Sequence, residues 1–443
     1  MQQLSGLDAS FLYFETPHTP MHIGSIQIYD QTALPGGVQG FKDILRHIEQ
    51  RLHAARTFRQ KVVNVPFGLD HPYWIEDRDF DLEFHVRHIR LPQPGDWRQL
   101  CIQVARLHSR PLDLSKPLWE FTIIEGLDAV EGLPQGCYAI VSKVHHACID
   151  GVSGVDMIEA IHDLDPDNPH VRPSDRPWHG EPDPNPLELL ARASINNALQ
   201  PFRLAEIAAR SLPAFGRFTQ GVAQRRFSAT KPVPRTRFNA SVSAHRAVEG
   251  RSFDLDEIRA IKASVPGATI NDVVLTVCGG ALRAYLEAKN ELPDISMVAM
   301  APISVRSTDQ RGSMGNQVAA MTVAIGTHIA DPLERLTAVH ADAMASKEMT
   351  QAVGAKLMTD YSQFIPSTTA ALAARMYTNL GIANRTNPIF NCVITNVPGP
   401  QVPLYCAGAR MVAHYGLGHP VRPSAAEHGP LRRDGPPGRN AGA

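Results

Sequence analysis

The chain has 443 residues, of which 43% are hydrophobic, and this length favours two domains of roughly 150 to 200 residues over a single core. Its 43 Lys and Arg residues almost balance its 44 Asp and Glu residues, which gives a formal net charge of -1. This balance excludes a global positive field that would draw the protein onto nucleic acid or an anionic membrane, so any such contact must be local.

The six cysteines include no C-x-x-C pair, which argues against a zinc ribbon, a thioredoxin-type site and a secreted disulfide framework. The first residues lack the pattern of a signal peptide, and the sequence has no run of about 18 apolar residues. We therefore expect a cytoplasmic protein with reduced thiols that is either soluble or peripheral on a membrane surface.

The first part of the chain predicts a mixture of strands and helices. Residues 21–30 (MHIGSIQIYD) and 137–144 (CYAIVSKV) are typical of strands, and residues 41–55 have the apolar spacing of a helix that packs on one face. Another helix is expected over residues 153–164. We assign residues 1–162 to an N-terminal domain.

A Pro-rich and Asp-rich stretch, residues 163–186, cannot continue a helix or a central strand and is the best linker. Residues 187–226 follow with apolar residues and arginines at helical intervals. They fit either a pair of helices packed between domains or a basic amphipathic surface that touches lipid. The linker and these helices together form the predicted segment 163–240.

The second part, residues 241–418, again predicts helices and strands, and the tail 419–443 is rich in Pro, Gly and Arg and is expected to be disordered. Two helices are expected within residues 253–288. Strands are expected over residues 296–305, 318–326 and 389–397. The element order predicts two similar layered α/β (α+β) domains.

Residues 145–151, HHACIDG, place two adjacent histidines at the end of an expected strand. Successive side chains of an extended segment point to opposite faces, so His145 and His146 cannot easily share one target, which weakens a metal site. Histidine is the natural general base near neutral pH. Asp150 fits either an orienting partner for the imidazole or an anchor for the loop, and Gly151 allows a sharp turn. These residues alone leave a structural polar turn, a general-base site and a metal site open.

Other catalytic motifs are absent from the sequence. It contains no G-x-S-x-G nucleophile elbow, no phosphate-binding G-x-x-x-x-G-K-[ST] loop and no H-E-x-x-H zinc motif. Three further stretches stand out: KPLWE at 116–120, IND at 270–272 and TNVPGP at 395–400. Each by itself is more typical of packing, a helix cap or a rigid turn than of chemistry.

Taken in order, these stretches resemble the bacterial wax ester synthase/acyl-CoA:diacylglycerol acyltransferases, especially the actinobacterial triacylglycerol synthases. The opening LSGLDASFLYFETPHTPMHIGSI, then PLWE, HHACIDG, ND and NVPGP match the family's motifs over roughly residues 4 to 418. HHxxxDG alone is less specific, because carnitine acyltransferases, chloramphenicol acetyltransferase and peptide-synthetase condensation domains resemble it too.

The resemblance implies two chloramphenicol-acetyltransferase-like domains with an active-site tunnel between them, no metal and no cofactor. Acyl-CoA is the implied donor, and diacylglycerol or a long-chain alcohol is the implied acceptor. His146 is the implied general base for direct transfer without a covalent intermediate.

The resemblance also implies supporting residues. His145 would shape the turn, Asp150 would hold it through an arginine such as Arg306, and Gly151 would leave room for substrate. Further residues implied to bind or support the substrates are Pro117, Leu118, Trp119, Asn271 and Asp272, with Asn271 a candidate donor to the oxyanion.

After Gly418 the sequence departs from the family's pattern, in which further apolar strands follow. A reading-frame change near Gly418 would produce such a tail, and the loss of strands would leave a sheet edge open. This departure motivates a second hypothesis, a catalytically weak lipid-binding or lipid-droplet-associated protein that retains the fold.

Overall fold

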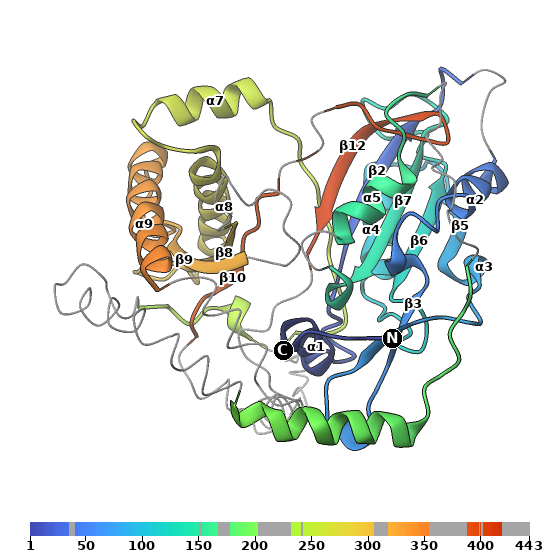
Figure 1. Cartoon of the computed structure of the whole chain (residues 1–443). Helices are drawn as coiled ribbons and strands as arrows, with labels where there is room; N and C mark the ends of the chain where they lie inside the picture. The colour runs from blue at the N-terminus through green and yellow to red at the C-terminus, as the bar shows by residue number, and fades with distance from the viewer. Residues whose placement is uncertain are drawn as a thin grey trace, which may run out of the picture.

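The computed structural model describes residues 1–34, 40–149, 153–166, 178–202, 232–240, 242–304, 318–353, 388–397, 399 and 402–418. Figure 1 shows an N-terminal part built on a large sheet and a C-terminal part in which α8 and α9 lie beside a smaller sheet, with α7 above these two helices in that view. Both parts mix helices and strands, which confirms the predicted fold class.

The large sheet has six strands in the order β11-β12-β2-β7-β6-β5, and all neighbours are antiparallel except β5 and β6. Its strands are β2 (His22–Asp30), β5 (Val86–Arg90), β6 (Trp119–Glu125), β7 (Tyr138–His145), β11 (Tyr405–Cys406) and β12 (Ala409–Leu417). β2 and β7 confirm two of the predicted strands, and β7 lies between β2 and β6.

Helices cover both faces of this sheet because its central strands are apolar on both faces. Ile140 of β7 packs in the core with Ile44 and Ile48 of α2, whereas Val141 packs in the opposite core with Leu100 of α4. The helices of this part are α1 (Gly6–Phe14), α2 (Phe41–Glu49), α3 (Leu82–His85), α4 (Trp97–His108) and α5 (Ser153–Ile161).

A small sheet of order β1-β4-β3 lies beside the N-terminal part, with strands β1 (Gln2–Gln3), β3 (Gln60–Val63) and β4 (Tyr73–Glu76). Residues 186–202 form a helix whose Leu189 and Ala193 pack against Val65 and Tyr73. Short 3-10 helices occur at η1 (Arg56–Phe58), η2 (Pro66–Gly68), η3 (His146–Cys148) and η4 (Arg237–Asn239).

Within the described residues, the C-terminal part contains a sheet of order β10-β8-β9 together with helices. Its elements are α7 (Leu255–Ala263), α8 (Ile270–Glu287), β8 (Val298–Ser304), β9 (Val318–Ala324), α9 (Pro332–Val353) and β10 (Cys392–Val393). The expected helices and the strands β8 and β9 are confirmed. The strand expected over 389–397 is shorter than predicted, because only Cys392 and Val393 pair with β8.

The last described strand, β12, returns to the N-terminal sheet and pairs with β2 from Arg410 opposite Asp30 to Leu417 opposite Gly24. It is the red strand beside β2 in Figure 1. The sequence-based range 241–418 treats this stretch as part of the second domain. In the structure β12 pairs with β2, so a strand from this range completes the N-terminal sheet.

A buried ion pair lies where the hairpin β11–β12 meets the N-terminal part. Asp163 exchanges backbone hydrogen bonds with Tyr405 of β11, at 2.7 and 2.9 Å. Its carboxylate accepts two bonds from Nη2 of Arg51, at 3.0 and 2.9 Å. Both side chains are at most 4% exposed. The pair therefore fixes the residue on which the crossing hairpin docks.

We expect Asp163→Asn to lower the free energy of unfolding by about 3 kcal/mol, because removing one partner leaves the Arg51 charge buried without full compensation. Urea unfolding followed by circular dichroism measures the change. Asp256→Asn is the matched control, because its partner Arg259 is 61% exposed and surface pairs contribute only about 0.5 kcal/mol. Equal losses in the two variants would contradict the role of the buried pair.

Candidate active site

The two histidines of HHACIDG lie where β7 ends and η3 begins. The backbone N–H of His145 donates to the carbonyl oxygen of Leu118 at 2.9 Å, and that of His146 donates to the carbonyl oxygen of Met21 at 2.8 Å. Successive amides of a central strand point to opposite neighbours, so each histidine is held by a different flank of β7. The backbone of the turn is therefore fixed on both sides.

The imidazole of His145 is fully buried, and both of its nitrogens have partners. Nδ1 accepts a hydrogen bond from the backbone N–H of Ala147 at 3.1 Å, which leaves the proton on Nε2. Nε2 donates to Oε2 of Glu15 at 2.7 Å. His145 thus caps η3, and neither ring nitrogen remains open to a substrate proton.

His146 lies on the other side of the turn and is half-buried. Its ring stacks on Phe11, with 4.0 Å between ring centroids and 15° between the planes. Burial lowers the pKa of His146, and the neighbouring His145 lowers it further. The imidazole is therefore neutral near pH 7, the state in which a histidine can accept a proton.

Helix α1 supplies the contacts that hold both rings. It ends at Phe14 with Glu15 as its C-cap, and its Ala9 packs together with Leu4 and with Ala147 of the turn. No sequence motif assigned a role to Phe11 or Glu15, although Glu15 is a single acidic residue that directly follows the largely apolar stretch SFLYF. That isolated charge is the feature of the sequence that could have indicated a role for Glu15.

The PLW stretch lies directly beside the turn. Pro117, Leu118 and Trp119 are buried, and Leu118 supplies the carbonyl oxygen that holds His145. Nε1 of Trp119 donates to the carbonyl oxygen of Phe58 at 2.9 Å, so this side chain belongs to the core. The motif supports the site through packing and one backbone bond.

The ND stretch begins α8 in the C-terminal part. Asp272 forms a capping box with Thr269, and its carboxylate accepts a hydrogen bond from Nδ1 of His340 at 2.9 Å. Asn271 precedes it and is partly exposed. Across the described ranges, the side-chain bonds of Asp272 stay within the C-terminal part. Its local role is to fix the start of α8 against α9.

Three predicted site residues, Asp150, Gly151 and Arg306, lie outside the described residues. Within the ranges that are described, no group of three or more His, Cys, Asp or Glu side chains is arranged to hold a metal ion. A search of the same ranges finds no helix with the length and hydropathy needed to cross a membrane.

The sequence matches one known protein family over most of its length. The wax ester synthase/diacylglycerol acyltransferase catalytic domain matches residues 4–274, and the C-terminal domain of the same family matches residues 314–425. The chain belongs to this family. The resemblance inferred from the sequence motifs is thereby confirmed.

Relatives in Mycobacterium tuberculosis are similar over almost the full chain. A putative diacylglycerol O-acyltransferase of strain CDC 1551 is 33% identical over 419 residues, which cover 94% of this chain and 81% of the relative. A probable diacylglycerol O-acyltransferase of strain H37Rv is 32% identical over 418 residues, which cover 93% of this chain and 87% of the relative.

Solved structures show the same fold. The wax ester synthase/diacylglycerol acyltransferase of Marinobacter aquaeolei VT8 superposes with a TM-score of 0.64 at 27% identity, over 95% of this chain and 87% of that chain. The first condensation domain of the CDA synthetase gives a TM-score of 0.51 at 13% identity, over 96% and 84% of the two chains. At that identity the likeness concerns the fold alone.

We expect Glu15→Leu to destabilise the protein by about 1 to 3 kcal/mol, because the buried Nε2–H of His145 would lose its acceptor. Glu15→Gln is the matched control, since its side-chain carbonyl can still accept that bond. Urea unfolding of the two variants measures the difference. A Leu variant as stable as the Gln variant would show that this hydrogen bond does not hold the turn.

Proposed function

We propose that this protein is an acyl-CoA-dependent O-acyltransferase that forms triacylglycerol from diacylglycerol and can also form wax esters from long-chain alcohols. The observation that carries the proposal is the neutral, half-buried His146 at a rigid turn. Membership of the wax ester synthase/diacylglycerol acyltransferase family supports the choice of reaction. Acyl-CoA is a co-substrate, and the proposed transfer uses only groups of the protein and the two substrates.

In the proposed mechanism His146 acts as general base. It accepts the proton of the acceptor hydroxyl while that oxygen attacks the thioester carbonyl of acyl-CoA. The tetrahedral intermediate then collapses, the carbon–sulfur bond breaks, and the protonated His146 returns the proton to the departing sulfur. The products are an ester and free CoA, and no acyl group is attached to the protein.

Other residues would support this step without exchanging protons. His145 and Glu15 hold the turn, and the ring of Phe11 fixes the plane of the His146 imidazole. We assign Asp150 to anchoring the loop through Arg306, and Gly151 to leaving space for substrate. Asn271 is the proposed donor to the oxyanion, a role that requires an N–H about 3 Å from the developing charge.

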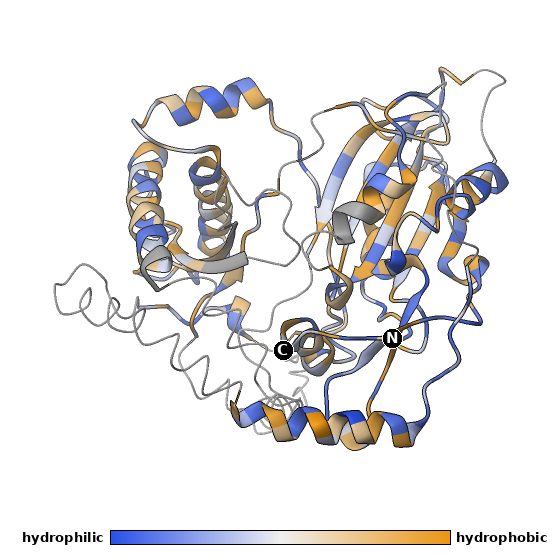
Figure 2. Ribbon diagram, viewed as in Figure 1, coloured by the Kyte–Doolittle hydropathy of each residue, from blue (hydrophilic) through white to orange (hydrophobic). Residues whose placement is uncertain are grey.

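We also propose that the protein takes its acceptor from a lipid surface, since diacylglycerol and long-chain alcohols dissolve poorly in water. The helix over residues 186–202 exposes Leu187, Ile195 and Phe202 at 73%, 62% and 75%. Figure 2 shows hydrophobic residues along this helix, which runs below the N-terminal part in that view. These exposed side chains support peripheral contact, while Leu189 and Ala193 attach the helix to the protein.

His146→Ala should reduce acyl transfer by about 100-fold to 10,000-fold, the range that a positioned general base contributes. Labelled acyl-CoA supplied with diacylglycerol, monoacylglycerol and a long-chain alcohol measures both turnover and acceptor preference. His179→Ala serves as the control because His179 is exposed. Full turnover by the His146 variant would contradict the general-base assignment. Lipid that co-purifies with a wild-type protein inactive on every acceptor would favour the lipid-binding alternative.

A further inference from the structure

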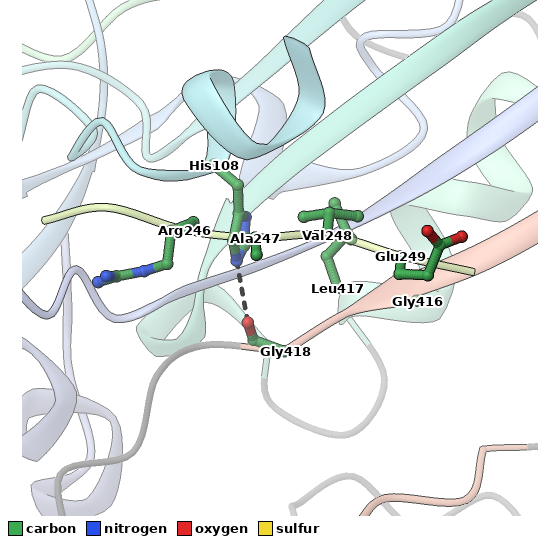
Figure 3. A pocket seen from close by; sticks show the side chains of 8 residues that line it. All are labelled: His108, Arg246, Ala247, Val248, Glu249, Gly416, Leu417 and Gly418. Carbon is green, nitrogen blue, oxygen red and sulfur yellow. Dashed lines mark hydrogen bonds between the residues drawn. The ribbon is translucent and has the colours of Figure 1, made fainter. Parts of the chain in front are cut away.

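A groove lies on the N-terminal part between the extended segment 246–249 and residues 416–418, which are the end of β12 and the glycine that follows it. It has a volume of about 280 Å³, and His108, the last residue of α4, forms one of its walls. Figure 3 shows the two segments on either side and the hydrogen bond from His108 to Gly418. The groove is open to solvent and belongs to none of the motifs discussed above.

Both long walls of this groove are extended backbone. In the part of the chain that the structure describes, no backbone hydrogen bond joins residues 247–249 to β12. β2 pairs with one edge of β12, and β11 covers the other edge only at Ala409 and Arg410. Backbone N–H and C=O groups are strong donors and acceptors, so these walls can pair with an extended ligand.

At two glycines the β12 wall of the groove has no side chain. A Cβ atom added at Gly416 or at Gly418 would meet no atom within 4 Å. A glycine inside a strand weakens it and often marks a place where a ligand or another backbone approaches closely. Val248 and Leu417 add apolar side chains to the two walls. The groove thus combines open peptide groups with apolar surface.

A short series of hydrogen bonds connects the groove to the catalytic turn. His146 donates its backbone N–H to Met21, and the next residue, His22, donates Nε2–H to the carbonyl oxygen of His108 at 2.8 Å. His108 in turn donates Nε2–H to the carbonyl oxygen of Gly418 at 2.9 Å. Burial, followed by the neighbouring His108 and Lys143, lowers the pKa of His22 to about 2, so its ring is neutral. The direction of its bond is fixed because a carbonyl oxygen can only accept.

We propose that this groove seats the pantetheine arm of the acyl-CoA donor. The inference rests on the proposed function. The arm is an extended chain with two amide groups, each of which offers one N–H and one C=O to the groove walls. Diacylglycerol and long-chain alcohols carry no amide N–H, so they match the paired donors and acceptors less well. The arm leads toward the turn and delivers the thioester to His146.

Variants that fill the groove test this assignment. Val248→Trp and Gly416→Val should each raise the KM for acyl-CoA about tenfold and weaken the binding of desulfo-CoA, measured by calorimetry, by the same factor. The KM for diacylglycerol should stay within twofold, and so should the KM for an acyl-N-acetylcysteamine donor, which lacks most of the arm. Because Val248 also packs on the core, Gly416→Val provides the readout if the Trp variant fails to fold.

Val412→Trp is the matched control, because Val412 lies on the same strand outside the groove and is 42% exposed. The Val412→Trp variant should change neither the KM for acyl-CoA nor the Kd for desulfo-CoA. An unchanged Kd for desulfo-CoA in Gly416→Val, or a raised KM for diacylglycerol, would overturn the assignment. A wild-type protein that neither binds CoA nor transfers acyl groups would instead refute the proposed function, so the two failures are distinguishable.

Discussion

The imidazole of His145, held between the backbone amide of Ala147 and the carboxylate of Glu15, is the interaction on which the site depends. It ends β7, caps η3 and determines where the next residue points. Because both nitrogens of His145 have partners, we assign the proton transfer of the proposed mechanism to His146. A polar pair this deep in the protein is stable only because each group is satisfied, and the loss of either partner leaves a buried donor or acceptor without compensation.

The turn is also the point where distant segments of the chain meet. Helix α1 and its C-cap come from the first fifteen residues and supply Phe11 and Glu15. Leu118 and Met21, which directly precede β6 and β2, hold the backbone from either side. Beyond β2 lies β12, which arrives from the far end of the chain and is anchored through Asp163 and Arg51. The same strand borders the proposed donor groove, so β12 and β2 connect that groove to the turn that carries His145 and His146.

Much of this architecture could be predicted from local patterns. β2, β7, β8 and β9 have strongly apolar sequences, and α8 begins with the capping pair Thr269 and Asp272. The position of His146 in a conspicuous motif was also visible, although choosing it over a polar turn or a metal site required the order of all five motifs.

The remaining features depend on contacts between residues that are remote in sequence. Glu15 and His145 are 130 positions apart, and no local pattern pairs an isolated acid with a particular histidine. The stretch ARMVAHYGL alternates between more and less exposed residues as a strand does, yet its partner is β2, nearly four hundred residues earlier. Hydrophobic periodicity predicts that a strand exists but does not identify the sheet it joins.

The most direct test of this account is the pH dependence of kcat/KM for acyl transfer, which reports ionisation of the free enzyme. Protonated His146 cannot accept a proton, so the rate should fall as the pH drops through the pKa of this residue. Burial lowers that pKa from its ordinary value of 6.5, and we therefore predict more than half of the maximal rate at pH 6.5 and a single acid limb with its midpoint below that value. The protein must remain folded across the range, as circular dichroism can verify. An acid limb with its midpoint at or above pH 6.5, or a rate independent of pH down to the onset of unfolding, would contradict a buried, neutral His146 as the base.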